Sequence, residues 1–102
     1  TLHEAGHVVR ASHEHFDGNG YPDHLRGHEI PIAARVVAVA DAFSAMTTRR
    51  TYREPLPLPA AAAELRANAG SQFDPAVVDA ALVVLARDLD VPVSLTGGAD
   101  RA

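Results

Sequence analysis

The sequence has no cysteine, no lysine and no tryptophan. Without cysteine there are no disulfides or thiolate metal sites, so any metal must be held by His, Asp or Glu, and a reducing compartment fits. No apolar run approaches the roughly 20 residues that span a bilayer, and no signal peptide is visible. We therefore expect a soluble, cytoplasmic chain without membrane contact. The net charge of −4 gives no footprint for nonspecific nucleic-acid binding.

The length of 102 residues and the hydrophobic content of 47% predict one small all-α domain, a helical bundle of about four helices. No strand pattern competes. The second helix is apolar on nearly every side, which predicts a place in the middle of the bundle. We assign residues 1–90 to the domain and 91–102 to a flexible tail, and the Thr start predicts a piece of a longer protein. The expected helices cover residues 2–15, 32–46 and 59–69, with a last one that begins at the Asp74-Pro75 cap.

Residues 12–22 join a cluster of imidazoles and carboxylates to a loop broken by glycines. Gly18 and Gly20 permit positive φ and Pro22 fixes the exit, so the loop is expected to have one defined shape. The run His13-Glu14-His15 cannot all face one ion if it is helical, because consecutive helical residues point about 100° apart. Each of the three taken alone favours a surface or loop-capping role.

Asp41 lies in the most apolar of the expected helices. A buried carboxylate normally requires a partner, and its helical neighbours at positions 37, 38, 44 and 45 provide no cation. The partner is then an arginine across the bundle or a metal, and the alternative is a structural Asp hydrogen-bonded in the core. A site of imidazole and carboxylate suits Fe, Mn or Zn.

A competing motif lies upstream, where His3, Glu4 and His7 match the HExxH pattern of zinc peptidases. His13 falls at the third histidine of the extended pattern, but that pattern needs a glycine at the position of Arg10. An unbroken helix instead puts His13 about 280° from His3. The peptidase is therefore kept only as a remote alternative.

An ordered series of motifs is more specific than any single one of them. Together the motifs resemble the HD-GYP family from residue 2 to about residue 85, in the C-terminal portion of the family's domain. The resemblance implies a helical-bundle metal-dependent phosphodiesterase that opens cyclic di-GMP to the linear dinucleotide or onward to GMP. The series consists of His13-Glu14, residues 17–23, 27–31, 35–43, 50–53 and 70–75.

The resemblance also implies residue roles. His13 and Asp41 match metal ligands of a two-metal site that holds iron or manganese. Arg50 and Arg53 match positions that bind the substrate, a task that suits planar guanidinium groups. The signature loop is associated with loop architecture and with contacts to diguanylate cyclase domains, and its matching residues are Asp17, Gly18, Gly20, Tyr21 and Pro22.

The chain departs from the family pattern in several places. The His-Asp dyad that names the HD superfamily, and its lysine, would precede Thr1, so no catalytic residue of the family falls within the chain. Ser12, Ser44 and Thr51 replace a family histidine, aspartate and proline. We therefore expect the 102 residues alone to be inactive. The alternative function is a catalytically incomplete binding module for cyclic di-GMP or for a diguanylate cyclase.

Overall fold

The computed structural model describes residues 2–88, and all regular structure within them is helical. Residues 2–88 contain no strand, only two isolated bridges that pair Arg50 with Arg53 and Ala69 with Phe73. No helix in this range is long and apolar enough to cross a bilayer. The all-α prediction is confirmed, while the predicted tail at 91–102 lies outside the described residues. The elements are α1 (Leu2–Ala11), the 3-10 helix η1 (Gly27–Glu29), α2 (Ile32–Thr47), α3 (Leu58–Ala67) and α4 (Pro75–Asp88).

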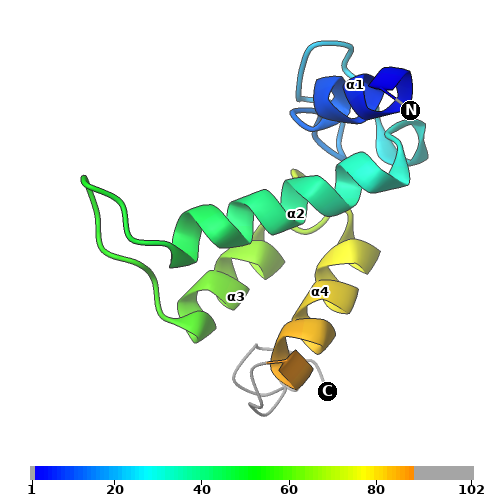
Figure 1. The fold of residues 1–102 in the computed structure, drawn as a ribbon. Coiled ribbons are helices and arrows are strands. Elements are labelled where there is room, and N and C mark those ends of the chain that lie inside the picture. The colour runs from blue at the N-terminus through cyan, green and yellow to red at the C-terminus, as the bar shows by residue number, and fades with distance from the viewer. Residues whose placement is uncertain (1, 89–102) are drawn as a thin grey trace.

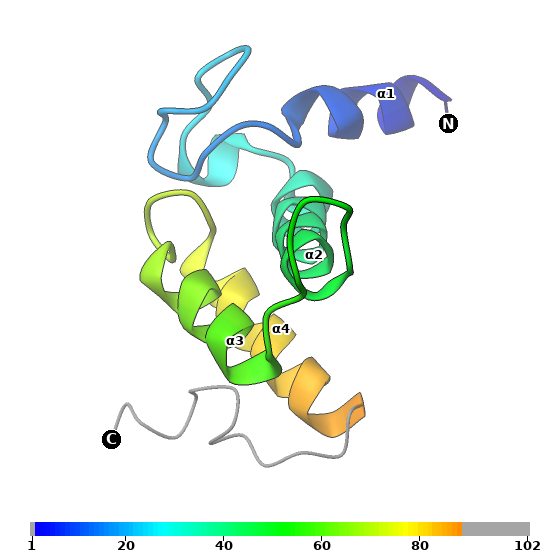
Figure 2. The same cartoon turned by 90° about the vertical axis from the view of Figure 1, so that its left-hand side faces the viewer.

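Helix α2 is the central element, as its apolar sequence predicted. It contacts α1, α3 and α4. Figure 1 shows α1 on one side of α2 and the α3–α4 pair on the other, and the view along α2 in Figure 2 shows the same order. The three other α-helices of residues 2–88 therefore all pack against α2.

Two apolar clusters lie on the two sides of α2. The larger joins α2 to α3 and α4 and is centred on buried Val39, Leu65, Phe73, Val78 and Leu82. The smaller joins α1 to the start of α2 and contains buried Ala11, Ile30 and Ala34, with Val8 and Leu25 packed against it. The larger cluster holds the bundle, whereas the smaller one attaches the segment that carries His13.

Helix α1 is shorter than predicted and buries a different face. It ends at Ala11 rather than at residue 15, because the chain turns there: the Ser12 amide bonds to the Val9 carbonyl, and the Glu14 amide to the Ala11 carbonyl. The helical spacing of Leu2, Ala5, Val8, Val9 and Ser12 would put all five on one face. Leu2 is instead 93% exposed and Val9 is 68% exposed, so the inward contacts come from Val8 and Ala11.

The middle position of α2 does not bury it on every side. Ile32 and Val36 are exposed, and so is Asp41. Asp41 is therefore not the buried carboxylate that the sequence predicted, and it needs no partner to offset the loss of water.

The predicted start of α4 is confirmed. Asp74 Oδ1 accepts a hydrogen bond from the Ala76 amide at 2.9 Å, which is the N-cap geometry, and Pro75 is the first helical residue. Asp74 Oδ2 also accepts a hydrogen bond from Arg35 Nη1 at 2.8 Å, and Arg35 Nε donates to the Ile30 carbonyl at 2.9 Å. One ion pair thus joins the start of α2 to the start of α4.

Candidate functional site

His13 and Asp41 come together at one pocket of about 350 Å³. His13 lies in the turn after α1, and Asp41 lies in the second half of α2. Gln72, from the turn between α3 and α4, reaches the same pocket. The sequence pattern alone gives Gln72 no role beyond its place in the 70–75 motif. The other lining residues are Ser12, Glu14, His15, Tyr21, Ala38 and Ala42.

Glu14 holds the signature loop from inside. Its side chain is only 3% exposed. Its Oε2 accepts a hydrogen bond from the Asp23 amide at 2.7 Å, and its Oε1 accepts one from the Leu25 amide at 2.9 Å. The loop-capping interpretation is therefore confirmed for Glu14. Both oxygens are committed to the loop backbone, so Glu14 stabilises the loop instead of offering a carboxylate to the pocket.

Two glycines give the loop its shape for different reasons. Gly18 has a φ of +89°, which favours glycine. Gly20 packs against the backbone of the turn that carries His13, and a Cβ there would lie 2.6 Å from the Glu14 carbonyl carbon. The sequence permits positive φ at both glycines, and of the two Gly18 adopts it. Gly20 is needed for space, which the sequence pattern does not reveal.

Tyr21 follows this close contact, and its ring stacks on the imidazole of His13 with a lateral offset. The two ring centroids are 5.2 Å apart and the ring planes differ by 9°, a stacked arrangement. The Tyr21 amide donates a hydrogen bond to the His13 carbonyl at 3.2 Å, and the Tyr21-Pro22 peptide bond is cis. The signature loop and the candidate ligand His13 are thus parts of one local structure.

The turn between α3 and α4 braces the same loop. The Phe16 amide donates to the Gln72 carbonyl at 3.1 Å, and the Asp17 amide donates to the Ser71 carbonyl at 2.9 Å. These backbone hydrogen bonds connect segments more than 50 positions apart in the sequence. They fix the position of Gln72 beside the pocket of His13 and Asp41.

Local contacts lower the pKa of two carboxylates on the loop. A hydrogen bond from Arg10, at 2.9 Å, lowers the pKa of Asp23 from its usual value. The hydrogen bond from the Asn19 amide lowers the pKa of Asp17. These interactions shape the outside of the loop and do not reach into the pocket.

The donor set of the pocket fits part of a metal site. His13 and Asp41 supply the imidazole and carboxylate that suit a divalent transition metal. However, the described residues contain no group of three or more His, Asp or Glu side chains arranged to hold an ion. A catalytic metal centre commonly has three protein ligands. His13 and Asp41 would therefore hold a metal only together with further donors.

Arg50 and Arg53 do not share this pocket. They lie in the loop after α2, at the opposite end of α2 from α1 (Figure 1), and residues 49–54 line a separate pocket of about 550 Å³. Arg53 Nη2 donates to the Ala45 carbonyl at 2.7 Å, and its guanidinium lies 5.8 Å from the centre of the Tyr52 ring. The loop presents exposed guanidinium groups but does not bring them to His13.

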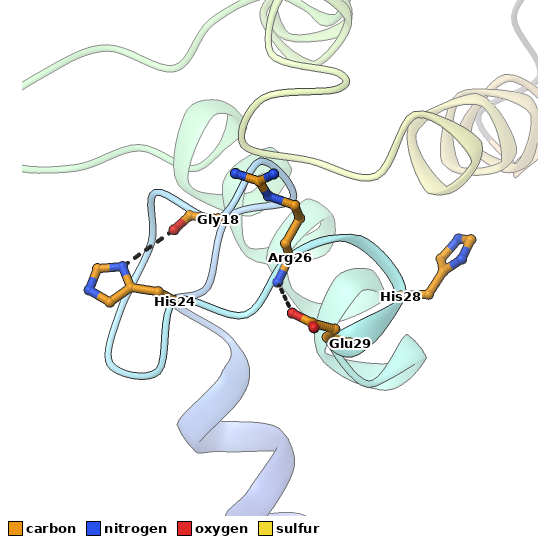
Figure 3. A pocket seen from close by; sticks show the side chains of 5 residues that line it. All are labelled: Gly18, His24, Arg26, His28 and Glu29. Atoms are coloured by element: carbon orange, nitrogen blue, oxygen red, sulfur yellow. Dashed lines mark hydrogen bonds between the residues drawn. The ribbon is translucent and has the colours of Figure 1, made fainter.

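A larger and more open hollow of about 730 Å³ lies on the loop beside Gly18. Figure 3 shows His24 and His28 at opposite ends of it and pointing apart, while the Arg26 amide donates to Glu29 Oε1 at 2.9 Å. His24 Nδ1 lies 3.3 Å from the Gly18 carbonyl oxygen. Because these side chains do not converge, the smaller pocket of His13 and Asp41 is the better candidate site.

The residues of the HExxH motif do not have a third metal ligand beside them in residues 2–88. His3, Glu4 and His7 are exposed on α1, and residues 2–88 bring no third metal-binding side chain to them. His13, which the extended pattern would require, lies beyond the end of α1 and is stacked on Tyr21. The structure offers no support for a zinc peptidase site.

Comparison with known proteins identifies the relatives of this fold. A family model described as an HD domain matches residues 1–77. A probable cyclic di-GMP phosphodiesterase of Vibrio cholerae is 39% identical over 90 residues, which cover 88% of this chain and 20% of that protein. A cyclic di-GMP phosphodiesterase response regulator of Xanthomonas campestris is 53% identical over 75 residues, covering 74% of this chain and 20% of the relative.

The solved structures agree with these sequences. The crystal structure of a cyclic GMP-AMP specific phosphodiesterase of Vibrio cholerae matches with a TM-score of 0.65 and 25% sequence identity, over 94% of this chain and 20% of that chain. The chain thus spans about a fifth of the length of these relatives. Because the family model covers most of its residues, the chain belongs to the HD domain family, and its likeness to the HD-GYP phosphodiesterases is confirmed.

Proposed function

We propose that this chain contributes part of the active site of a metal-dependent phosphodiesterase that hydrolyses cyclic di-GMP to the linear dinucleotide or to GMP. The observation that carries the proposal is the convergence of His13 and Asp41 on one pocket, in a chain whose relatives are named cyclic di-GMP phosphodiesterases. Both residues match metal-ligand positions of the resemblance, and they come from segments that are 28 positions apart in the sequence.

HD-domain phosphodiesterases are metal-dependent, and we propose iron or manganese in a two-metal site. A bound divalent ion lowers the pKa of a coordinated water and neutralises charge on the phosphate. In this proposal His13 contributes a neutral imidazole and Asp41 a negative charge, while Gln72 offers an uncharged amide at the pocket wall. Ser12 lines the pocket without adding a strong ligand.

The substrate is proposed to be a cyclic dinucleotide, with its phosphates bound by Arg50 and Arg53. Guanidinium groups bind phosphate oxygens in pairs and stack on bases, so exposed arginines on a short loop suit this ligand. The Arg50 and Arg53 backbones hydrogen-bond to each other, at 3.4 Å in both directions, which holds the loop compact. A cytoplasmic location and a diguanylate cyclase partner at the signature loop of residues 17–23 complete the proposal.

A second candidate is a binding module that holds a cyclic dinucleotide without cleaving it. It is favoured by Ser12, which stands where the family pattern has a histidine, while the substrate-matching arginines Arg50 and Arg53 are present and exposed. In this function the ligand would remain intact after binding. The two candidates therefore differ in the product and not in the ligand.

Both candidates are tested by assaying the 102-residue chain and the product of the complete reading frame side by side with Mn²⁺. We expect the complete product to convert cyclic di-GMP into the linear dinucleotide, and the 102 residues alone to leave it intact. His13→Ala or Asp41→Ala should lower the turnover of the complete product by about 100-fold or more, which is about 2.7 kcal/mol. A parallel assay with cyclic GMP-AMP tests which cyclic dinucleotide is preferred.

His28→Ala is the matched control, because His28 is an exposed histidine outside the pocket of His13 and Asp41. Its turnover should equal that of the unaltered protein. If calorimetry shows that the full-length protein binds cyclic di-GMP but the assay detects no linear dinucleotide or GMP, the binding module is the correct function and the phosphodiesterase is wrong. Full turnover in His13→Ala would contradict the metal assignment.

A further inference from the structure

We propose that Tyr21 is a positioning residue that orients the imidazole of His13 by stacking on it. The inference deepens the proposed function, because it gives the tyrosine of the signature loop a task at the metal pocket. The family resemblance connects the loop only with architecture and with a protein partner. The geometry of the two rings carries the argument.

The two rings form a nearly parallel, offset stack, and His13 remains exposed. The ring planes lie within 9° of parallel, with centroids 5.2 Å apart. The lone pairs that bind metals lie in the plane of the imidazole ring, at its nitrogens. A tyrosine ring above the face therefore restricts rotation of His13 without blocking either nitrogen. Both side chains line the pocket that also contains Asp41.

His13 depends on this contact for its orientation. Its side chain is exposed, just beyond the end of α1. Within residues 2–88, no hydrogen bond fixes its ring nitrogens, and Tyr21 is the ring that it contacts. Ligating histidines elsewhere are commonly oriented by a hydrogen bond to the second nitrogen. Here the aromatic stack takes the place of that bond.

Tyr21 is itself held firmly by the backbone. Its amide donates to the His13 carbonyl at 3.2 Å, and Gly20 fits against the turn of residues 13–15, where a side chain has no room. Glu14 then fixes the two loop amides that follow, at Asp23 and Leu25. The tyrosine ring is thus attached at a defined place over the imidazole, although 60% of its surface is exposed.

The first test uses nuclear magnetic resonance on the 102-residue chain at one fixed pH, and it needs neither metal nor substrate. A tyrosine stacked on His13 shields the carbon-bound protons of the imidazole. Tyr21→Ala should shift these signals downfield, and Tyr21→Phe should restore them, because phenylalanine keeps the ring. Tyr52→Ala is the control, since the other tyrosine lies in the arginine loop beside Arg53 and should leave the His13 signals unchanged.

The second test measures the Mn²⁺ concentration that gives half-maximal turnover of cyclic di-GMP by the product of the complete reading frame. Tyr21→Ala should raise this concentration about two- to tenfold, the range expected for loss of one aromatic pair, with little change in kcat at saturating Mn²⁺. Tyr21→Phe should restore the original value. A lower kcat with an unchanged Mn²⁺ requirement would contradict the positioning role.

The two proposals fail separately. If the complete product leaves cyclic di-GMP intact, the proposed function is wrong, while the ring signals of His13 still decide whether Tyr21 orients it. If Tyr21→Ala folds and its His13 signals equal those of the unaltered chain, the positioning role is overturned. Correct folding is checked from the amide signals of Leu65, Val78 and Leu82, which are buried in the core formed by α2, α3 and α4.

Discussion

The ion pair between Arg35 and Asp74 should make a large contribution to stability. Asp74→Ala removes the acceptor of the Arg35 hydrogen bond and also the N-cap acceptor of α4. Both side chains are mostly buried, with exposed fractions of 13% for Arg35 and 5% for Asp74. Without Asp74, the charge of Arg35 would remain mostly buried with neither its carboxylate partner nor full contact with water, and this destabilises the folded state.

The magnitude follows from the two losses. Removal of an N-cap acceptor costs about 1 kcal/mol. Breaking a fully buried ion pair costs about 3–5 kcal/mol, and we take about 2 kcal/mol here because Arg35 keeps some exposure and its bond to the Ile30 carbonyl. Asp74→Ala should therefore lower the free energy of unfolding by about 3 kcal/mol, out of the 5–15 kcal/mol typical of a domain. The corresponding fall in Tm is about 12–24 °C.

Asp74→Asn separates the two contributions. Asparagine is a good N-cap residue, so the cap is kept while the charge is lost. We expect a loss of about 1–2 kcal/mol for Asp74→Asn in urea unfolding of the 102-residue chain, clearly smaller than for Asp74→Ala. Glu54→Gln is the control, because the pair of Arg49 and Glu54 is exposed, at 70% and 76%, and should contribute less than about 1 kcal/mol.

The effect should also depend on pH. Burial raises the pKa of Asp74. The hydrogen bonds from Arg35 and from the Ala76 amide, together with the charge of Arg35, lower this pKa by more than burial raises it, so the pKa in the folded state lies below its ordinary value. The stabilisation is then fully present above the unfolded pKa of about 3.9 and is lost as the pH falls through the folded pKa. The gap between the unaltered chain and Asp74→Asn should close over that acidic range. An Asp74→Ala variant within about 0.5 kcal/mol of the unaltered chain at pH 7 would refute the reasoning.

Two further predictions concern the signature loop and the pocket. Gly20→Ala should destabilise the chain by about 1–3 kcal/mol in urea unfolding, because the new Cβ has no room against the turn of His13. Gly6→Ala is the control: nothing lies within 4 Å of its new Cβ, and it should stabilise α1 by about 0.5–1 kcal/mol. Equal effects of the two variants would contradict the close fit at Gly20. Ser12→His adds to the pocket a third donor beside His13 and Asp41. The variant chain should therefore bind Mn²⁺ at least about tenfold more tightly than the unaltered chain, or about 1.4 kcal/mol, measured by Mn²⁺ broadening of the His13 signals. Ser12→Ala is the control, and equal broadening in Ser12→His and the unaltered chain would mean that residue 12 does not face the ion.

The sequence by itself determined the all-α class, the start of α4 and the family. Local rules were sufficient where local contacts decide the structure: the Asp74-Pro75 cap starts α4, and the apolar run of α2 places it between the other helices. The spacing of the motifs identified the HD-GYP likeness, which the relatives confirm. Buried Glu14 and the exposed faces of α1 and α2 were not predictable, because they depend on which segments fold back onto these helices.

Only the tertiary structure decided how the candidate site is assembled. It put His13, Asp41 and Gln72 around one pocket and left Arg50 and Arg53 at a separate one. It also showed Gly20 as a packing requirement and Tyr21 as the ring over His13. The physical reason is that periodicity and capping act over a few residues, whereas pocket, stack and loop arise from backbone contacts between segments that are distant in sequence, such as Phe16 with Gln72.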